Sequence, residues 1–397
     1  REEDLASLIY TSGTTGNSKG VMLTHKNLVW NADISTDVYV NLKPGDKVLS
    51  ILPISHVYEF TTGQILELMR GCEIVYLGKA PAPSVLLPAL KEVRPRIVMT
   101  VPLLMEKVYR SSVLPVLRDN KNLEKWLKYP VVRRFICRVI GRKLKMTFGG
   151  RLKFFGIGGA PLDREVEQFL SDAKFPYASG YGLTETSPLI AGGQPKKHYV
   201  GTIGKLVEHV DVKLENPDPA TGVGEILVKG PNVMQGYYDN PSLNAEVFTS
   251  DGYFRTGDLG HLDKHGRLSI KGRTKTMILG SGGENIYPEL IEAVINNQSF
   301  VTESLVVPEH GGLIALVKID FDMFAQKMAI NVNDAKTEAL KYVAKLREDV
   351  NKELSAFSRI SAVELQEEPF QRTPTQKIKR FLYSRIKDDG SKDKPQT

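Results

Sequence analysis

A glycine- and hydroxyl-rich stretch near the start of the chain has the composition of a phosphate-binding loop. It runs from Thr11 to Gly20 and follows a predicted apolar strand over residues 5–10. Glycines let the backbone turn tightly and present N–H groups to an anion, while hydroxyls and a lysine donate to phosphate oxygens. The spacing of a Walker A loop is absent, so the stretch alone predicts a nucleotide or phosphate site, with a flexible surface loop as the alternative. The residues assigned to this site are Thr11, Ser12, Gly13, Thr14, Thr15, Gly16 and Lys19.

Two carboxylates in glycine-containing turns are the next candidates. Asp258 closes the run Thr256-Gly257-Asp258, and one carboxylate can accept hydrogen bonds from both hydroxyls of a ribose. Glu185 follows Thr184. Mg²⁺ takes few carboxylates and completes its shell with phosphate oxygens and water, so a single glutamate is adequate. The alternatives are a turn cap for Asp258 and solvated surface charge for Glu185.

An uncharged, glycine-rich turn and one tyrosine are suited to a flat aromatic base. Gly158-Gly159-Ala160-Pro161 is narrow and rich in backbone, which permits close approach of an adenine. Tyr181 offers an aromatic face for stacking. An ordinary strand-to-helix turn would use the same glycines.

The elements that must position these residues alternate between strands and helices over 1–199, which predicts the α/β part of a large domain. Short strands and frequent turns predict a small all-β subdomain over 200–274. A helix, a hairpin and a long charged helix predict an α+β domain over 275–397 that ends in a polar tail. Strands are expected over 48–53, 96–101, 154–159, 304–307 and 313–319, and helices over 61–70, 102–109, 163–171, 288–295 and 334–355.

Composition narrows the class of protein. The 397 residues suffice for two or more domains, and the two cysteines, Cys72 and Cys137, fit no metal site or disulfide framework. A reducing, cytoplasmic setting is therefore expected. No apolar run reaches the roughly 20 residues of a membrane-spanning helix.

Positive charge is concentrated over 121–153. Eleven basic residues and one acidic residue give this segment a net charge of +10, against +7 for the whole chain. Within it, apolar residues recur at helical spacing, which predicts a basic amphipathic helix. Three interpretations remain open: peripheral contact with an anionic membrane, packing of the apolar stripe on the large domain, which we favour, and contact with phosphates of coenzyme A. The predicted stripe comprises Val132, Phe135, Ile136, Val139 and Ile140.

The order of motifs along the chain resembles the adenylate-forming superfamily of acyl-CoA synthetases, luciferases and peptide-synthetase adenylation domains. Eight stretches in one order are far more specific than any one of them. The stretch LPISHVYE (52–59) is most similar to long-chain fatty acyl-CoA synthetases, with Glu59 as a marker of that group. The stretches are YTSGTTGNSKG (10–20), LPISHVYE (52–59), FGIGGAPL (155–162), GYGLTET (180–186), YFRTGDLG (253–260), IKGRTKTMI (270–278), GGENIYPELIE (282–292) and RTPTQKIKR (372–380).

The resemblance implies roles for these residues. It makes Glu185 a Mg²⁺ ligand, Thr184 a contact to the α-phosphate, and Asp258 with Arg273 ribose or phosphate contacts. It implies that His56 lies near the substrate carboxylate; a buried core histidine is the alternative. It implies a fatty acid, ATP and coenzyme A as substrates, Mg²⁺ as cofactor, and no nucleic-acid partner. The implied adenine contacts are Gly159, Ala160, Pro161, Tyr181 and Gly182.

The resemblance also implies domain alternation, in which the C-terminal domain rotates and exchanges Lys377 for a face that helps build the coenzyme A channel. The residues involved lie in the C-terminal motifs. Lys377 is implied to bridge the attacking carboxylate and the α-phosphate, and Lys275 is implied to be the hinge. The sequence departs from the commonest pattern at Gln376, where glycine is usual, and at Ser18, where proline is common. Neither change removes a reactive group. The implied lining of the coenzyme A channel is Ser281, Gly282, Gly283, Glu284 and Asn285.

The implied fold is an α/β large domain with a β-barrel-like subdomain, followed by a small mobile α+β domain. Members carry an additional segment before the phosphate loop, which here begins at residue 11, so we expect the N-terminal part of the large domain to be lacking and the acid pocket to be incomplete. Two alternatives stay open: transfer of the acyl group to the phosphopantetheine of a carrier protein, and nucleotide binding without turnover.

Overall fold

The protein folds into two compact units, Arg1–Ile270 and Lys271–Thr397. Unit 1 contains the motifs predicted to bind the nucleotide, and unit 2 begins just before the predicted hinge residue Lys275. The computed structural model describes residues 1–12, 18–38, 42–79, 81, 83–118, 125–195, 197–280, 284–309, 312–328, 331–372 and 378–385.

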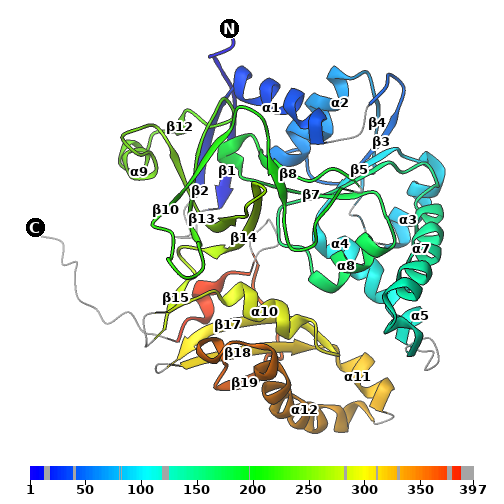
Figure 1. Ribbon diagram of the computed structural model, residues 1–397. Coiled ribbons are helices and arrows are strands. Elements are labelled where there is room, and N and C mark those ends of the chain that lie inside the picture. Colours follow the sequence, from blue (N-terminus) through cyan, green and yellow to red (C-terminus); the bar gives the residue numbers. More distant parts are fainter. Residues whose placement is uncertain are drawn as a thin grey trace, which may run out of the picture. The chain divides into compact units, whose positions relative to one another are not determined.

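Five parallel strands form one half of the main sheet of unit 1 (Figure 1). They lie in the order β4-β3-β5-β6-β7, so the direction of winding reverses beside β3. All four residues of β5 and of β6 are buried, which is typical of parallel strands covered on both faces. These strands are β3 (Lys47–Ser50), β4 (Glu73–Tyr76), β5 (Ile97–Thr100), β6 (Phe154–Ile157) and β7 (Tyr177–Gly182).

The other half of this sheet is antiparallel and continues from β7 through β8 and β9. The described strands of residues 204–229 and 254–273 therefore extend the main sheet. Helix α9 (Pro241–Val247) interrupts the stretch expected to be all-β, because the Asn240 side chain caps it and Pro241 suits its first turn. These strands are β8 (Leu189–Gly192), β9 (Gly204–Leu206), β10 (Asp211–Glu215), β11 (Gly224–Lys229), β13 (Phe254–Leu262) and β14 (Arg267–Arg273).

Helices pack beside the parallel strands where the sequence predicts them. Asp163 caps α8 by accepting hydrogen bonds from the N–H groups of Glu165 and Val166. The stretch predicted to be helical over 61–70 is π-helical over Glu59–Ile65 and α-helical over Leu66–Met69, which is α2. The other helices are α1 (His25–Val38), α2 (Leu66–Met69), α3 (Pro83–Val93), α4 (Pro102–Val108), α5 (Leu114–Arg118), α7 (Pro130–Thr147) and α8 (Arg164–Asp172), with a π-helical turn, Tyr109–Val113.

Helix α7 carries the basic segment and lies beside α3 and α8 (Figure 1). Ile136 and Ile140 pack on the core of unit 1, as the favoured interpretation predicts. Phe135 and Val139, which were assigned to the same apolar stripe, are exposed. The predicted stripe is therefore wrong in part, because Cys137, Gly141 and Leu144 complete the packed face instead.

A separate three-stranded sheet carries the predicted phosphate loop. Strands β1 (Leu5–Ser12) and β2 (Ser18–Thr24) form a hairpin, and β12 (Gly236–Tyr237) pairs with β2. Of the strand expected over 5–10, Ile9 alone is fully buried. The two ends of the glycine-rich stretch are thus paired strands, and Gly13 to Asn17 lie outside the described residues.

Unit 2 has the predicted α+β composition. The antiparallel pair of β17 and β18 confirms the expected hairpin, and β19 adds a parallel strand. Helices α10 and α12 confirm the two expected helices, and Pro288 opens α10. The elements are β15 (Ile278–Leu279), β16 (Asn285–Ile286), α10 (Pro288–Asn296), β17 (Val301–Glu309), β18 (Gly312–Ile319), α11 (Phe321–Met328), α12 (Val332–Glu353) and β19 (Ala362–Leu365), with short 3₁₀ turns at Ala356–Ser358 and Arg380–Tyr383.

Candidate active site

The carboxyl ends of the parallel strands bring two of the predicted motifs together. In open α/β sheets such ends, near a reversal of winding, are where ligands bind. A Cβ atom on Gly158 would lie 3.3 Å from the ring of Tyr58, and one on Gly156 would lie 2.8 Å from its hydroxyl oxygen. Glycines on β6 and after it therefore make room for Tyr58, which belongs to the segment that follows β3.

The predicted adenine contacts lie in this region. Gly159 has a φ of +86°, which favours glycine, and Gly159, Ala160 and Pro161 are exposed after the end of β6. Gly182 is required for packing, since a Cβ atom there would lie 1.7 Å from the carbonyl oxygen of Pro188. These exposed backbone groups are available to a ligand.

Tyr181 and Asp258 are in direct contact although they are far apart in the sequence. The Tyr181 hydroxyl donates a hydrogen bond of 2.9 Å to Oδ2 of Asp258. The Asp258 carboxylate is buried, with 4% of the residue exposed, and its backbone N–H donates to Oγ1 of Thr256. The predicted base-stacking and ribose-binding residues are therefore neighbours on β7 and β13.

Glu185 lies in a short 3₁₀ turn, Thr184–Thr186. Its backbone carbonyl accepts from the N–H of Met234, and its Oε1 accepts a 2.8 Å hydrogen bond from the hydroxyl of Tyr237. Thr184 is half-buried in the same turn. This turn is therefore tied to the segment that contains β12.

Lys19, on strand β2 of the hairpin that contains the phosphate loop, also contacts Tyr237. Its Nζ lies 5.1 Å from the centroid of the Tyr237 ring, a cation–π distance. Lys19, Glu185 and Tyr237 come from three distant stretches of the chain. Sequence reasoning missed Tyr237, because nothing local marks it and its role depends on the pairing of β12 with β2.

The carboxylate of Glu185 fits a Mg²⁺ ion that brings most of its own ligands. Among the described residues, no group of three or more histidine, cysteine, aspartate or glutamate side chains could hold a metal ion. Mg²⁺ is commonly bound by one or two carboxylates together with substrate phosphates and water. One carboxylate that shares Tyr237 as a neighbour with a lysine suits a metal that arrives with a nucleotide.

His56 is exposed and lies just before the helical stretch that leads into the π-helical segment, and its backbone carbonyl accepts from the N–H of Phe60. The alternative of a buried core histidine is therefore wrong. Nearby Glu59 is buried, and burial raises its pKa to about 7 even though Ser50 donates a hydrogen bond to its Oε1. Glu59 is thus an internal acid whose pKa lies near neutral pH.

The remaining predicted residues belong to unit 2. Arg273 ends β14, and its carbonyl accepts from the N–H groups of Thr276 and Met277 in the turn that contains Lys275. Glu284 is exposed and Asn285 is half-buried at the start of β16, whereas Ser281, Gly282 and Gly283 lie outside the described residues.

Lys377 also lies outside the described residues, but both flanks of its segment are anchored. Arg372 and Ile378 form an isolated antiparallel bridge. Arg372 pairs with Glu303 on β17, and Arg380 pairs with Glu292 on α10. The segment therefore starts and ends at defined points of unit 2.

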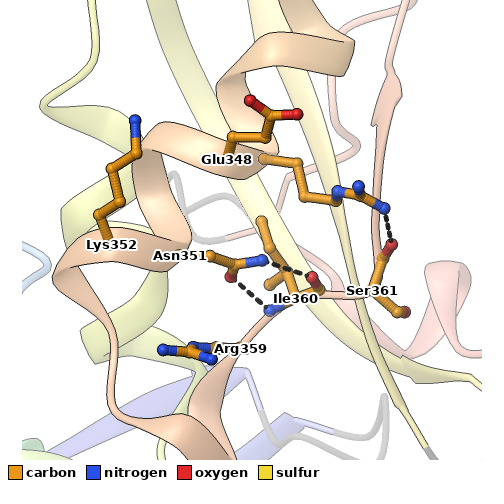
Figure 2. A pocket seen from close by; sticks show the side chains of 7 residues that line it. Glu348, Asn351, Lys352, Arg359, Ile360 and Ser361 are labelled. Atoms are coloured by element: carbon orange, nitrogen blue, oxygen red, sulfur yellow. Dashed lines mark hydrogen bonds between the residues drawn. The ribbon is translucent and has the colours of Figure 1, made fainter.

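A pocket of about 450 Å³ lies between α12 and residues 359–361, which precede β19, and Figure 2 shows its lining. Asn351 clamps the backbone of Ile360 by donating to its carbonyl and accepting from its N–H. None of the residues assigned to the nucleotide, the metal or the thiol lines this pocket. We therefore interpret it as a groove between packed elements.

Comparison with known proteins agrees with the motifs. Residues 1–238 match the family described as AMP-binding enzyme. A long-chain-fatty-acid–CoA ligase of Mycobacterium bovis is 31% identical in an alignment of 416 positions, which covers 96% of this chain and 67% of the relative. Long-chain-fatty-acid–CoA ligase 1 of Homo sapiens is 31% identical over 420 residues, which cover 95% of this chain and 59% of the relative.

A solved structure shares the fold. ATP-bound MatB from Rhodopseudomonas palustris is 27% identical with a TM-score of 0.74, and the match covers 96% of this chain and 68% of that one. The chain thus spans 59% to 68% of the length of these three proteins.

Proposed function

This chain belongs to the AMP-binding enzyme family, and from that membership we propose that it activates a long-chain fatty acid as acyl-AMP and transfers the acyl group to coenzyme A. The observation that carries the proposal is the contact of Lys19, Tyr237 and Glu185, which gathers a cation and a carboxylate from separate motifs. The long chain of the acid is supported by the names of the curated relatives.

In the first step, an oxygen of the fatty acid carboxylate attacks the α-phosphorus of ATP. The bond to the β-phosphate breaks, and pyrophosphate leaves with the electron pair. Lys19 and backbone N–H groups of the hairpin hold the phosphates, Thr184 contacts the α-phosphate, and Asp258 and Arg273 hold the ribose. Lys377 bridges the carboxylate and the α-phosphate, which lowers the repulsion between two anions. Mg²⁺, held by Glu185, would neutralise phosphate charge when it is bound.

In the second step, the thiol of coenzyme A releases its proton to water and the sulfur attacks the acyl carbon. The bond between this carbon and the phosphate oxygen breaks, and AMP leaves with the electron pair. Neither step needs a covalent nucleophile of the protein, so catalysis rests on positioning and charge stabilisation. Rotation of unit 2 about Lys275 withdraws Lys377 and brings the segment 281–285 to the thiol channel.

The test is acid-dependent exchange of pyrophosphate into ATP over a series of fatty acid chain lengths. Exchange that rises with chain length and needs the acid supports the proposal; nucleotide binding without exchange contradicts it. Thioester formation is then measured with coenzyme A and with a phosphopantetheinylated carrier protein. Product with the carrier alone would reject coenzyme A as the acceptor.

We also propose that α7 makes a peripheral contact with anionic membranes, where long-chain acids reside. Within the described residues, no helix is long and apolar enough to cross a membrane. The exposed face of α7 carries four apolar residues spaced four and seven positions apart, among exposed basic side chains. Phe135 on this face is 67% exposed. The apolar residues are Val131, Phe135, Val139 and Met146.

The basic side chains of α7 differ in their ion pairs and in their exposure to solvent. Arg133 and Arg134 pair with the buried carboxylate of Asp172 on α8, at 2.9 and 3.7 Å. Arg138, Arg142 and Lys143 are exposed. Each basic residue near an anionic surface contributes about 1 kcal/mol, and apolar insertion adds to it.

Co-sedimentation with vesicles of phosphatidylserine and phosphatidylcholine tests this contact. Arg138→Gln with Arg142→Gln should weaken binding to anionic vesicles at low salt, and Phe135→Ser should weaken it at every salt concentration. The control, Lys341→Gln with Lys345→Gln on α12, should bind as the wild type does. No sedimentation of the wild type would reject the contact, and equal sedimentation of all variants would reject α7 as its site.

A further inference from the structure

One buried tyrosine contacts both the lysine assigned to the phosphates and the glutamate assigned to the metal. Tyr237 is 5% exposed and lies on the two-residue strand β12. Its hydroxyl donates to Oε1 of Glu185 at 2.8 Å, and its ring lies 5.1 Å from Nζ of Lys19. A single side chain thus links the turn that contains Glu185 with the hairpin that contains the phosphate loop.

The backbone of Tyr237 is held from two sides. On β2, Val21 is its register partner, and the N–H of neighbouring Tyr238 donates to the carbonyl of Gly20. On α9, Asn244 accepts from the Tyr237 N–H at 2.7 Å and donates to its carbonyl at 3.0 Å. The ring therefore has a defined position relative to both charged partners.

The side chain of Glu185 is partly exposed, whereas the hydroxyl that it accepts from is buried. A hydrogen bond to one oxygen of a carboxylate restrains its rotation while the other oxygen keeps its lone pairs. Partners of this kind orient metal ligands.

We propose that Tyr237 is a positioning residue for the nucleotide-bound metal: its hydroxyl orients the Glu185 carboxylate toward the cation, and its ring holds the Lys19 ammonium near the phosphates. This inference rests on the proposed function. It assigns separate effects to the hydroxyl and the ring, and these can be measured separately.

The hydroxyl is tested by Tyr237→Phe, which keeps the ring. Binding of Mn²⁺ in the presence of α,β-methylene-ATP is followed by electron paramagnetic resonance, and binding of metal-free AMP by calorimetry. Loss of a group that hydrogen-bonds to a metal ligand typically weakens metal binding roughly 10–100-fold. We therefore expect about a tenfold rise in the Kd of Mn²⁺ and an unchanged Kd of AMP. The matched control is Tyr238→Phe, whose side chain belongs to a 57% exposed residue; both constants should stay at the wild-type values.

The ring is tested by Tyr237→Leu. It should weaken Mn²⁺ binding as Tyr237→Phe does, and should also weaken binding of the metal-free ATP analogue several-fold, because Lys19 loses its aromatic contact. An unchanged Mn²⁺ affinity in Tyr237→Phe, or equal losses for Mn²⁺ and AMP, would overturn the role of Tyr237 while the proposed function stands. If the wild type bound no Mn²⁺ with the analogue, the proposed function and the role of Tyr237 would both be overturned.

Discussion

Single residues of unit 1 account for most of the chemistry proposed here. Asp258 is buried, yet its carboxylate accepts a hydrogen bond from Tyr181. A buried carboxylate loses hydration that its neighbours must replace. The Tyr181 hydroxyl replaces part of this hydration by donating a hydrogen bond to Oδ2, and we propose that ribose hydroxyls donate to the same carboxylate.

Asp258→Ala should therefore raise the KM for ATP far more than the KM for the acid. A hydrogen bond to a charged group is worth roughly 1.5–3 kcal/mol, which corresponds to about a tenfold or larger rise in the KM for ATP. Steady-state kinetics with each substrate varied in turn measure the effect, with Glu208→Ala as an exposed control. An unchanged KM for ATP would rule out the ribose contact.

Lys377→Ala should remove the first step and spare the second. Loss of one group that stabilises developing charge costs about 10²–10³-fold in rate, so pyrophosphate exchange should fall at least that far. Thioester formation from preformed acyl-AMP and coenzyme A should stay near the wild-type rate, and Lys379→Ala serves as a nearby control. Equal losses in both steps would contradict domain alternation.

At the scale of elements, the segment between β3 and β4 buries two acids. Glu59 and Glu67 are 1% and 0% exposed, and Glu59 Oε2 has no hydrogen-bond partner among the described residues. Burial raises the pKa of each carboxyl to about 7. These acids are therefore protonated in the folded protein at pH values where the unfolded chain has released its protons.

The consequence is a loss of stability as the pH rises. Between the ordinary pKa of 4.5 and the folded value of about 7, the unfolded state binds fewer protons, so the free energy of unfolding falls with increasing pH and levels off above pH 7. Glu67→Gln removes one such group. Because one pKa unit is about 1.4 kcal/mol, the difference in unfolding free energy between pH 5 and pH 8 should shrink by about 2–3 kcal/mol.

Urea unfolding of wild type and Glu67→Gln at both pH values provides the measurement, with exposed Glu208→Gln as the control. The control should keep the pH dependence of the wild type. If the Glu67→Gln variant also kept the pH dependence of the wild type, the pKa of Glu67 would be the same in the folded and unfolded chains.

At the scale of the whole molecule, the proposed reaction depends on two compact units. Contacts divide the chain after Ile270, and the turn containing Lys275 follows β14 directly. A hinge needs a few residues whose φ and ψ can change. The position of Lys275 at the start of unit 2 suits such a role.

Lys275→Pro should slow thioester formation by tenfold or more and leave pyrophosphate exchange largely intact. Proline fixes φ near −65° and so restricts the conformations through which unit 2 would turn. Single-turnover assays of each step measure the effect, with Lys275→Ala as a control that keeps the backbone free. A proline variant with normal thioester formation would place the hinge elsewhere.

The sequence alone was sufficient where the determining contacts are local or where motifs follow one another in a family order. It predicted the α/β class, the strands around Val98 and Phe155, the helix that Asp163 caps, and the family to which the chain belongs. Periodicity, capping and motif order are properties of short stretches, so they can be read without a fold.

Tertiary structure decided what depends on distant neighbours. The exposure of Phe135 follows from which side of α7 faces the core, and periodicity alone misassigned this residue. The raised pKa of Glu67 depends on burial beneath other elements. Tyr237 has no local signal at all, because its contacts with Glu185 and Lys19 arise only when β12 pairs with β2, more than 200 residues away along the chain.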